Sequence, residues 1–139
     1  MITGLHHINL RAPPELLLTL RDFYRNVLGL QPGPRPGFKT RGYWLYAGGQ
    51  PVLHLSEQLP HEPRRGPVNP AAASTYDHTA FAGTDPAATA ARLARQGVPF
   101  RESRSEASRQ HQFFLQDPAG NGVEINFPFD VDPESGTSP

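Results

Sequence analysis

The sequence predicts an α+β fold built from two similar modules, each running from a strand through a helix into further strands. Two observations indicate this. The same order of hydrophobic patterns occurs twice along the 139 residues. Residues capable of metal or acid–base chemistry also recur at a nearly constant interval, because His78 follows His7 by 71 residues and Glu124 follows His54 by 70.

The first module covers residues 4–57 and begins with a strand at Leu5–Arg11, in which His7 lies on the face opposite Ile8 and Leu10. Pro13-Pro14-Glu15 then opens a helix, since proline and an early carboxylate both suit a first turn. Gly29 is placed to end this helix. Its apolar face is predicted from residues at helical spacing: Leu16, Leu20, Phe23, Tyr24 and Val27.

The rest of the first module is expected to be a hairpin. Residues 31–37 are rich in proline and glycine and predict a loop, which an aromatic strand at Phe38–Ala47 follows. Gly48-Gly49 indicates a tight turn. The next strand is Pro51–Ser56, where His54 lies on the face opposite Leu53 and Leu55.

Residues 58–75 contain four prolines and are expected to form a linker to the second module, residues 76–128. A strand is predicted at Tyr76–Ala82, carrying His78. Asp85-Pro86 begins a helix that runs through Gln96, with Thr84 or Asp85 as its N-cap, and Gly97 follows its end.

The second module closes with a pattern like that of the first. Residues 101–109 are polar and predict a strand with a mobile loop. A strand at His111–Gln116, a turn at Asp117–Asn121 and a strand at Val123–Phe127 follow, and Glu124 lies opposite Val123 on the last strand. Residues 129–139 are expected to be a flexible tail.

Composition excludes several classes of function. Lys plus Arg and Asp plus Glu both number 13, so no net field favours nucleic acid or an anionic membrane surface. No segment reaches the roughly 18 apolar residues of a membrane helix, and no signal peptide is recognisable, so we expect a cytoplasmic protein. Because the chain has no cysteine, any metal site must use histidine and carboxylate.

Each module thus offers one ligand-capable residue on its first strand and one on its last, on the face away from the apolar side chains. We predict a divalent transition metal (Zn, Ni, Co, Mn or Fe) bound by His7, His54, His78 and Glu124. The other three histidines are poorer candidates. His6 lies on the strand face opposite His7, His111 shares a face with the apolar Phe113, and His61 lies in the predicted linker. Three basic residues, Arg11, Lys39 and Arg41, are candidates for holding an anionic group of the substrate.

The sequence resembles the vicinal oxygen chelate superfamily, which includes glyoxalase I, fosfomycin-resistance transferases, extradiol dioxygenases and bleomycin-resistance proteins. The resemblance spans about Leu5 to Phe127. It rests on four segments: Gly-Leu-His-His-Ile-Asn-Leu, Arg-Asp-Phe-Tyr-Arg-Asn-Val-Leu-Gly-Leu, Asp-His-Thr-Ala-Phe and Phe-Leu-Gln-Asp-Pro-Ala-Gly-Asn-Gly-Val-Glu-Ile. It implies two βαβββ modules that form a curved mixed sheet cup with helices on the outside, around a metal held by the four residues named above.

The resemblance implies a glyoxalase-type lyase or isomerase acting on a small substrate chelated through vicinal oxygens, with Glu124 as first candidate for the base and His54 as second. A histidine at position 54 departs from the Glu or Gln common in glyoxalase-like members. A single-domain extradiol-type dioxygenase would instead use His7, His78 and Glu124 as its triad. The aromatic residues before the Asp-Pro turn, Phe113 and Phe114, depart from the fosfomycin-type pattern.

A third alternative is a non-catalytic binding protein of the bleomycin-resistance type. It would shelter an aromatic ligand among the aromatic side chains Phe38, Tyr43, Trp44, Tyr46 and Phe113. Of these, Trp44 and Phe113 are also the predicted aromatic contacts of an enzyme's substrate. A homodimer is expected, because related proteins close the two modules either within one chain or across a two-fold axis.

Overall fold

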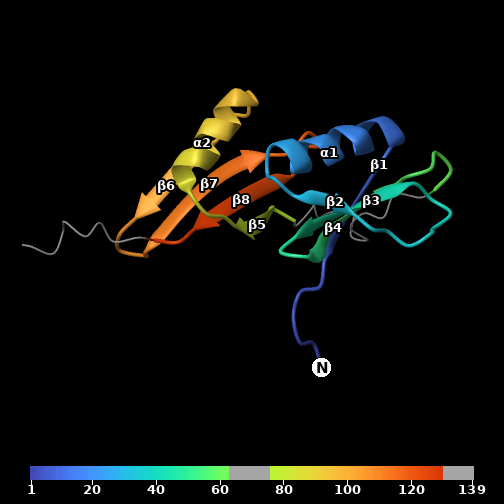
Figure 1. Cartoon of the computed structure of the whole chain (residues 1–139), viewed down its shortest axis with the longest axis horizontal. Helices are drawn as coiled ribbons and strands as arrows, with labels where there is room; N and C mark the ends of the chain where they lie inside the picture. The colour runs from blue at the N-terminus through green and yellow to red at the C-terminus, as the bar shows by residue number, and fades with distance from the viewer. Residues whose placement is uncertain (63–75, 130–139) are drawn as a thin grey trace, which may run out of the picture. The chain divides into compact units, whose positions relative to one another are not determined.

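The computed structural model describes residues 1–62 and 76–129, which form two compact units (Figure 1). Of the described residues, unit 1 contains 1–62, 76–77 and 117–121, and unit 2 contains 78–116 and 122–129. Most of the predicted linker and all but the first residue of the predicted tail lie outside the described residues. Neither helix of the described part is long and apolar enough to span a membrane.

Unit 1 has a four-stranded mixed sheet with the order β1-β4-β3-β2. Its elements, in chain order, are β1 (Ile8–Ala12), α1 (Pro14–Asn26), β2 (Gln31–Gly33), β3 (Gly42–Ala47) and β4 (Gln50–Glu57). β1 is parallel to β4, while β3 is antiparallel to both β4 and β2. The turn between β3 and β4 uses two left-handed glycines, Gly48 and Gly49, at φ 56° and 79°. Both glycines were predicted for this turn.

Unit 2 repeats this arrangement with the order β5-β8-β7-β6. Its elements are β5 (His78–Ala82), α2 (Pro86–Arg95), β6 (Arg101–Ser105), β7 (Gln110–Gln116) and β8 (Gly122–Phe127). β5 is parallel to β8, and the remaining pairs are antiparallel. The two βαβββ modules predicted from the sequence are confirmed.

The register of the strands repeats as well as their order. In unit 1, His54 pairs with Asn9 on one side and Trp44 on the other. In unit 2, Glu124 pairs with Ala80 and Phe114 at the equivalent places. His54 and Glu124 therefore occupy the same position of two equivalent sheets.

One face of the first sheet forms the core of unit 1. Leu45, Leu53 and Leu55 are completely buried on this face, and α1 contacts the strands β1, β3 and β4. The helix turns Leu17 rather than the predicted Leu16 into this core, because Leu17 shares a helical face with Leu20 and Tyr24. Burial of each such side chain contributes roughly 1.5–3 kcal/mol to the stability of the fold. This packing therefore stabilises the sheet whose opposite face carries His54.

The core of unit 2 is smaller and more aromatic. α2 buries Leu93, and the strands bury the apolar side chains Phe113, Leu115, Val123, Ile125 and Phe127. Asp85 is the N-cap, since its carboxylate accepts a hydrogen bond from the backbone N–H of Ala88 at 2.9 Å. The predicted cap is thereby confirmed, as is the left-handed Gly97 after the helix.

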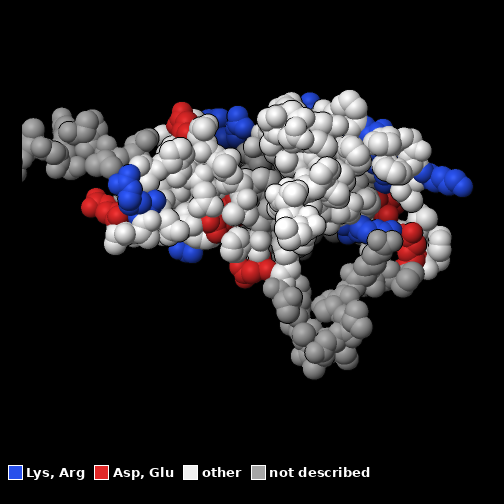
Figure 2. Space-filling view, turned by 90° about the horizontal axis from the view of Figure 1, so that it is seen from below, with Lys and Arg blue, Asp and Glu red and all other residues white. Residues whose placement is uncertain are grey.

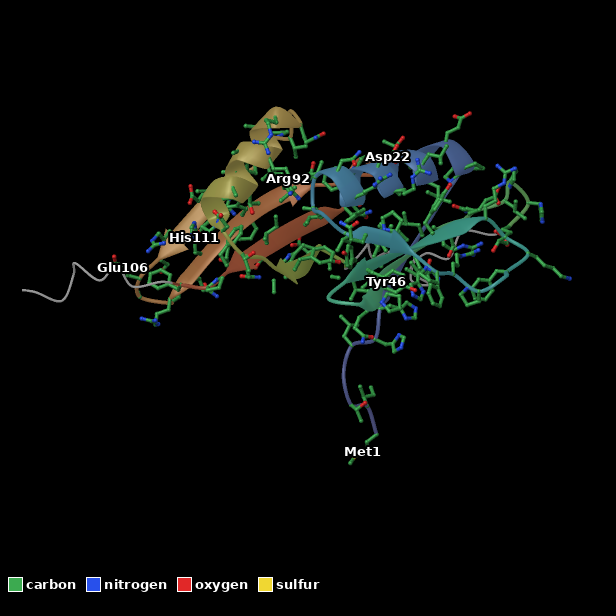
Figure 3. The ribbon with its side chains drawn as sticks, viewed as in Figure 1. Met1, Asp22, Tyr46, Arg92, Glu106 and His111 are labelled. Atoms are coloured by element: carbon green, nitrogen blue, oxygen red, sulfur yellow. The ribbon has the colours of Figure 1, made fainter. Side chains whose placement is uncertain are left out.

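Several predicted boundaries were wrong, including that of β5, which begins at His78 rather than Tyr76. β1 begins at Ile8 rather than Leu5, and the segment before it is exposed and carries Met1 away from the sheet (Figure 3). The predicted loop at 31–37 contains β2, whose Pro32 is tolerated because β2 is an edge strand. β3 begins at Gly42, so Lys39 and Arg41 lie in the preceding loop and do not share a strand face.

Candidate metal and substrate site

His54 lies in the middle of β4, on the face opposite the buried leucines. Its imidazole stacks on the indole of Trp44, with ring centroids 4.1 Å apart and planes 7° from parallel. The side chain is 7% exposed, and its Nε2 atom has no hydrogen-bond partner among the residues that the structure describes. A buried polar atom without a partner is costly, so this nitrogen is the position at which a ligand would be expected.

The surroundings of the His54 ring act on its protonation in opposite directions. The backbone of Pro51 raises the pKa of His54, but its effect is smaller than those of burial and of His7. Burial lowers the pKa of His54, with the neighbouring His7 adding to the effect, and this favours the neutral, ligating form.

His7 precedes β1 by one residue and is exposed. Its ring stacks face to face on that of His54, with centroids 3.8 Å apart and an interplanar angle of 16°. Its Nδ1 lies 2.9 Å from Nδ1 of His6. Because the lone pair of an imidazole nitrogen lies in the ring plane, two stacked rings do not aim at one point. Joint coordination by His7 and His54 therefore requires the exposed His7 ring to turn.

His78 and Glu124 form the corresponding pair of unit 2. His78 is the first residue of β5, and its Nε2 lies 3.0 Å from Oε2 of Glu124. Two donor atoms that each bind one metal at about 2.1 Å are separated by roughly 3.0–3.4 Å. The 3.0 Å separation is that of a direct contact between the imidazole and the carboxylate, and it also falls within the range for two adjacent ligands of one ion.

Two amides orient the Glu124 carboxylate, which is 6% exposed. The side-chain amide of Gln112 donates to Oε1 at 2.6 Å, and that of Asn126 donates to the same oxygen at 2.8 Å. Gln112 also donates to the amide oxygen of Asn126 at 3.0 Å. With Oε1 held in this way, Oε2 is the oxygen directed at His78, which is the arrangement that supporting residues give a carboxylate ligand.

The four predicted metal ligands thus occur as two pairs, one in each unit. No group of three or more His, Asp or Glu side chains able to hold a metal ion occurs within residues 1–62 and 76–129. Each unit by itself contains two of the predicted ligands. The four-ligand site needs both units and stays a prediction.

The predicted substrate-binding residues are placed unequally. Arg11 bonds to the Glu62 carboxylate and, at 3.3 Å, to the Glu57 carbonyl oxygen, so its guanidinium is already engaged. Lys39 and Arg41 are exposed in a loop. Trp44 is half-buried under His54, on the face that carries the ligand.

Phe113 lies on the opposite face of its sheet from Glu124. Its side chain is 1% exposed and packs against Phe100 and Phe127, so it cannot line a site beside Glu124. The neighbouring Phe114 pairs with Glu124 and lies on the same face. The repeat contained the signal for this, because Phe114 follows Trp44 by the same 70 residues that separate Glu124 from His54.

His111 shares the core face of Phe113, as the strand parity predicted, and lies on β7 (Figure 3). Its Nε2 is 2.7 Å from Oε1 of Glu102, and its ring packs against Phe127. His111 is therefore a buried histidine that a carboxylate satisfies, and it does not belong to the ligand-bearing face of unit 2.

Known proteins resemble this chain over most of its length. The sequence model of the glyoxalase/bleomycin resistance protein/dioxygenase superfamily matches residues 4–125. No curated protein matches the sequence. A crystal structure of a protein assigned to the glyoxalase family, from Bacillus anthracis, is similar with a TM-score of 0.67 at 22% identity, covering 92% of this chain and 97% of that one.

Two further solved structures extend the comparison. Lactoylglutathione lyase from Agrobacterium tumefaciens has a TM-score of 0.62 at 23% identity, with 91% of this chain and 94% of that one covered. A variant of the fosfomycin resistance protein FosX from Listeria monocytogenes, complexed with Mn(II) and a dihydroxypropylphosphonic acid, has a TM-score of 0.65 at 18% identity. There the coverage is 92% and 94%. At these identities the structures show a shared fold.

Proposed function

Because the chain belongs to the glyoxalase/bleomycin resistance protein/dioxygenase superfamily, we propose that it is a metal-dependent lyase or isomerase acting on a small substrate with two adjacent oxygens. The metal ligands in this proposal are His7, His54, His78 and Glu124. When bound, the divalent metal supplies Lewis-acid chemistry, polarising the substrate oxygens so that a neighbouring C–H becomes acidic.

The single observation that carries the proposal is the geometry of Glu124. Its Oε2 lies 3.0 Å from Nε2 of His78 while two amides hold Oε1. Burial of a carboxylate is costly unless it is paired, and here the imidazole and the two amides offset that cost while fixing Oε2 toward His78. The binding of Mn(II) by a FosX variant of the same fold agrees with a divalent metal in this family.

Glu124 is the proposed base. Its Oε2 is the oxygen that the two amides do not hold, so it is the atom that would take a proton from the substrate carbon and return it, once its contact with Nε2 of His78 is given up. Gln112 and Asn126 keep the carboxylate from rotating during this transfer. His54, whose Nε2 is buried, is the second candidate for moving the proton.

The three-ligand dioxygenase receives less support. In that enzyme His54 would not bind the metal, although its buried Nε2 has no hydrogen-bond partner among the described residues. A fourth protein ligand would occupy one of the open positions that oxygen and a catechol-like substrate require. Anaerobic purification distinguishes the two, since ferrous iron with oxygen uptake would favour the dioxygenase.

The experiment that tests the proposal measures metal content and affinity in wild type and in four single variants. His7→Ala, His54→Ala, His78→Ala and Glu124→Gln should each lower the affinity for Mn²⁺ by roughly 10- to 1000-fold, because each removes one donor atom. His61→Ala is the matched control, since His61 is exposed and outside both pairs. Wild type that retains no metal, together with ligand binding unchanged in His78→Ala, would instead favour the binding-protein alternative.

Two assemblies satisfy the proposal, since the two pairs of ligands can meet within one chain or across a two-fold dimer. In the dimer, dilution to monomers should release the metal. Sedimentation with simultaneous metal analysis decides between them. A verified monomer that keeps its metal would contradict the exchanged dimer.

A further inference from the structure

We propose that Arg101 binds an acidic group of the substrate, a carboxylate or a phosphate, on the same face of the second sheet as Glu124. This inference rests on the proposed function, because it names the class of molecule that the metal site would accept. It also moves the predicted anion-binding role from Arg11, whose guanidinium bonds to Glu62.

The register of unit 2 places these residues in one row. Glu124 on β8 pairs with Phe114 on β7, and Phe114 pairs with Arg101 on β6. Paired residues of neighbouring strands project from the same face of a sheet. The contact confirms this, because the guanidinium carbon of Arg101 lies 4.4 Å from the centroid of the Phe114 ring.

The guanidinium is positioned and yet available. Its carbon lies over the half-buried Phe114 ring, a contact that uses none of the N–H donors with which arginine binds carboxylates and phosphates through two hydrogen bonds. Within the part of the chain that the structure describes, no carboxylate forms an ion pair with Arg101. Glu124, the acidic group of the same row, is occupied by His78, Gln112 and Asn126.

Arg101 has no basic counterpart at the equivalent position of unit 1. The equivalent position of unit 1 is Gly33, which pairs with Trp44 as Arg101 pairs with Phe114. A Cβ at Gly33 would lie 2.6 Å from the ring of Tyr46, which donates a hydrogen bond to the Pro34 carbonyl oxygen. Unit 1 therefore has no room for a side chain at this position, and only unit 2 presents a cation in the row of its ligand.

The row also limits the length of the substrate. Arg101 and Glu124 are two strand spacings apart, about 9–10 Å between backbones, with Phe114 paired between them. The acidic group should therefore be a few bonds from the two chelated oxygens. Dihydroxybutanoate and glycerol phosphate have this form, with a vicinal diol and an acidic end, and butanediol with adjacent hydroxyls is their neutral analogue.

The test compares the binding of these three compounds to Mn²⁺-loaded wild type and to Arg101→Gln, by calorimetry. The substitution should weaken dihydroxybutanoate or glycerol phosphate roughly 10- to 100-fold, the value of a charge-assisted bidentate contact, and should change butanediol less than about twofold. Which acid loses more identifies carboxylate or phosphate as the preferred group. Arg101→Lys keeps the positive charge but not the planar pair of N–H donors, so its affinity for the two acids should be intermediate.

Arg104→Gln is the matched control, because Arg104 lies on the same strand but on the opposite face. It should leave all three affinities unchanged. Equal binding of both acids by wild type and Arg101→Gln would overturn the inference, and so would equal losses for the acids and butanediol.

Failure of the metal site is distinguishable from failure of this inference. If wild type binds no Mn²⁺, the same acids are titrated into metal-free protein while the Nε–Hε signal of Arg101 is followed by NMR. A shift with the acids and none with butanediol supports the anion site without the metal. No shift with either acid overturns it.

Discussion

At the scale of single residues, neighbouring side chains orient the predicted metal ligands. Glu124 takes its orientation from Gln112 and Asn126, and His54 stacks on Trp44. Unit 1 has no counterpart to the amide pair, because the position equivalent to Gln112 is Gly42, where a Cβ would lie 2.3 Å from the Leu55 carbonyl oxygen. The carboxylate is thus the more firmly oriented of the two predicted ligands at equivalent positions.

Gln112→Leu should therefore weaken the proposed metal site without removing one of its predicted ligands. The change deletes a donor to Oε1 of Glu124 at 2.6 Å, and loss of such a supporting contact typically lowers metal affinity about 10- to 100-fold. Competition for Mn²⁺ with a chelator measures the effect. Gln110→Leu is the control, since Gln110 is exposed on the same strand. Equal affinities of wild type and Gln112→Leu would contradict a positioning role.

Tyr24 is a buried residue whose ionisation opposes folding. Its hydroxyl donates to Oδ2 of Asp117 at 2.8 Å within unit 1, and burial together with this carboxylate raises the pKa of the phenol. A raised folded-state pKa means that stability is fully present below the unfolded value of about 10 and is lost as the pH rises above it.

The free energy of unfolding of wild type should consequently fall between pH 9 and pH 11 in urea titrations, more steeply than that of Tyr24→Phe. At pH 7 the variant should be less stable by about 1–2 kcal/mol, because one hydrogen bond to a carboxylate is lost. Asp117 keeps its bonds from the backbone of Ala119 and Asn121, so the variant should still fold. Parallel pH profiles would contradict a pKa of Tyr24 that is raised in the folded protein.

At the scale of elements, hydrophobic patterns predicted the strand faces well and the strand ends poorly. The alternation around His54 and Glu124 was right because helices α1 and α2 bury one face of each sheet, and that burial selects the pattern. β2 was missed because an edge strand needs few hydrogen bonds and tolerates Pro32. Phe113 was preferred to Phe114 as a substrate contact because aromatic character alone does not show which face a side chain occupies.

Helix α2 begins at a cap with unusual backbone geometry. Asp85 has φ 49° while its carboxylate accepts a hydrogen bond from Ala88. Asp85→Ala should lower the free energy of unfolding by about 1–3 kcal/mol. It removes the cap, and it leaves alanine in the left-handed region without the local hydrogen bond that makes this conformation tolerable for aspartate. Asp85→Asn, which retains both properties, should be nearly neutral in the same urea titration. Equal losses in both variants would point to the negative charge instead.

At the scale of the whole molecule, the sequence repeat predicts which positions of the two units are equivalent, but it does not predict how every side chain is oriented. Strand order and register recur in both units, so His54 and Glu124 are equivalent, as the spacing of 70 residues predicted. The exposed surface carries both signs of charge, and Lys and Arg are interspersed with Asp and Glu on the face shown in Figure 2. The 70-residue spacing does not predict that His7 stacks on His54 in unit 1. His7 lies before the first strand, where the alternation of strand faces no longer determines the direction of a side chain.

The stoichiometry of metal binding tests whether the two pairs act together. One shared ion predicts one Mn²⁺ per chain, and it predicts that His54→Ala and Glu124→Gln each weaken that single site. Because either variant already destroys the shared coordination sphere, the double variant should lose much less than the combined single losses. Trp44, the only tryptophan of the chain, stacks on His54, so its fluorescence should be quenched on binding in wild type and much less in Glu124→Gln. Independent sites would give two ions per chain, additive losses, and a Trp44 response that Glu124→Gln leaves intact, and that result would contradict a single centre formed by both units.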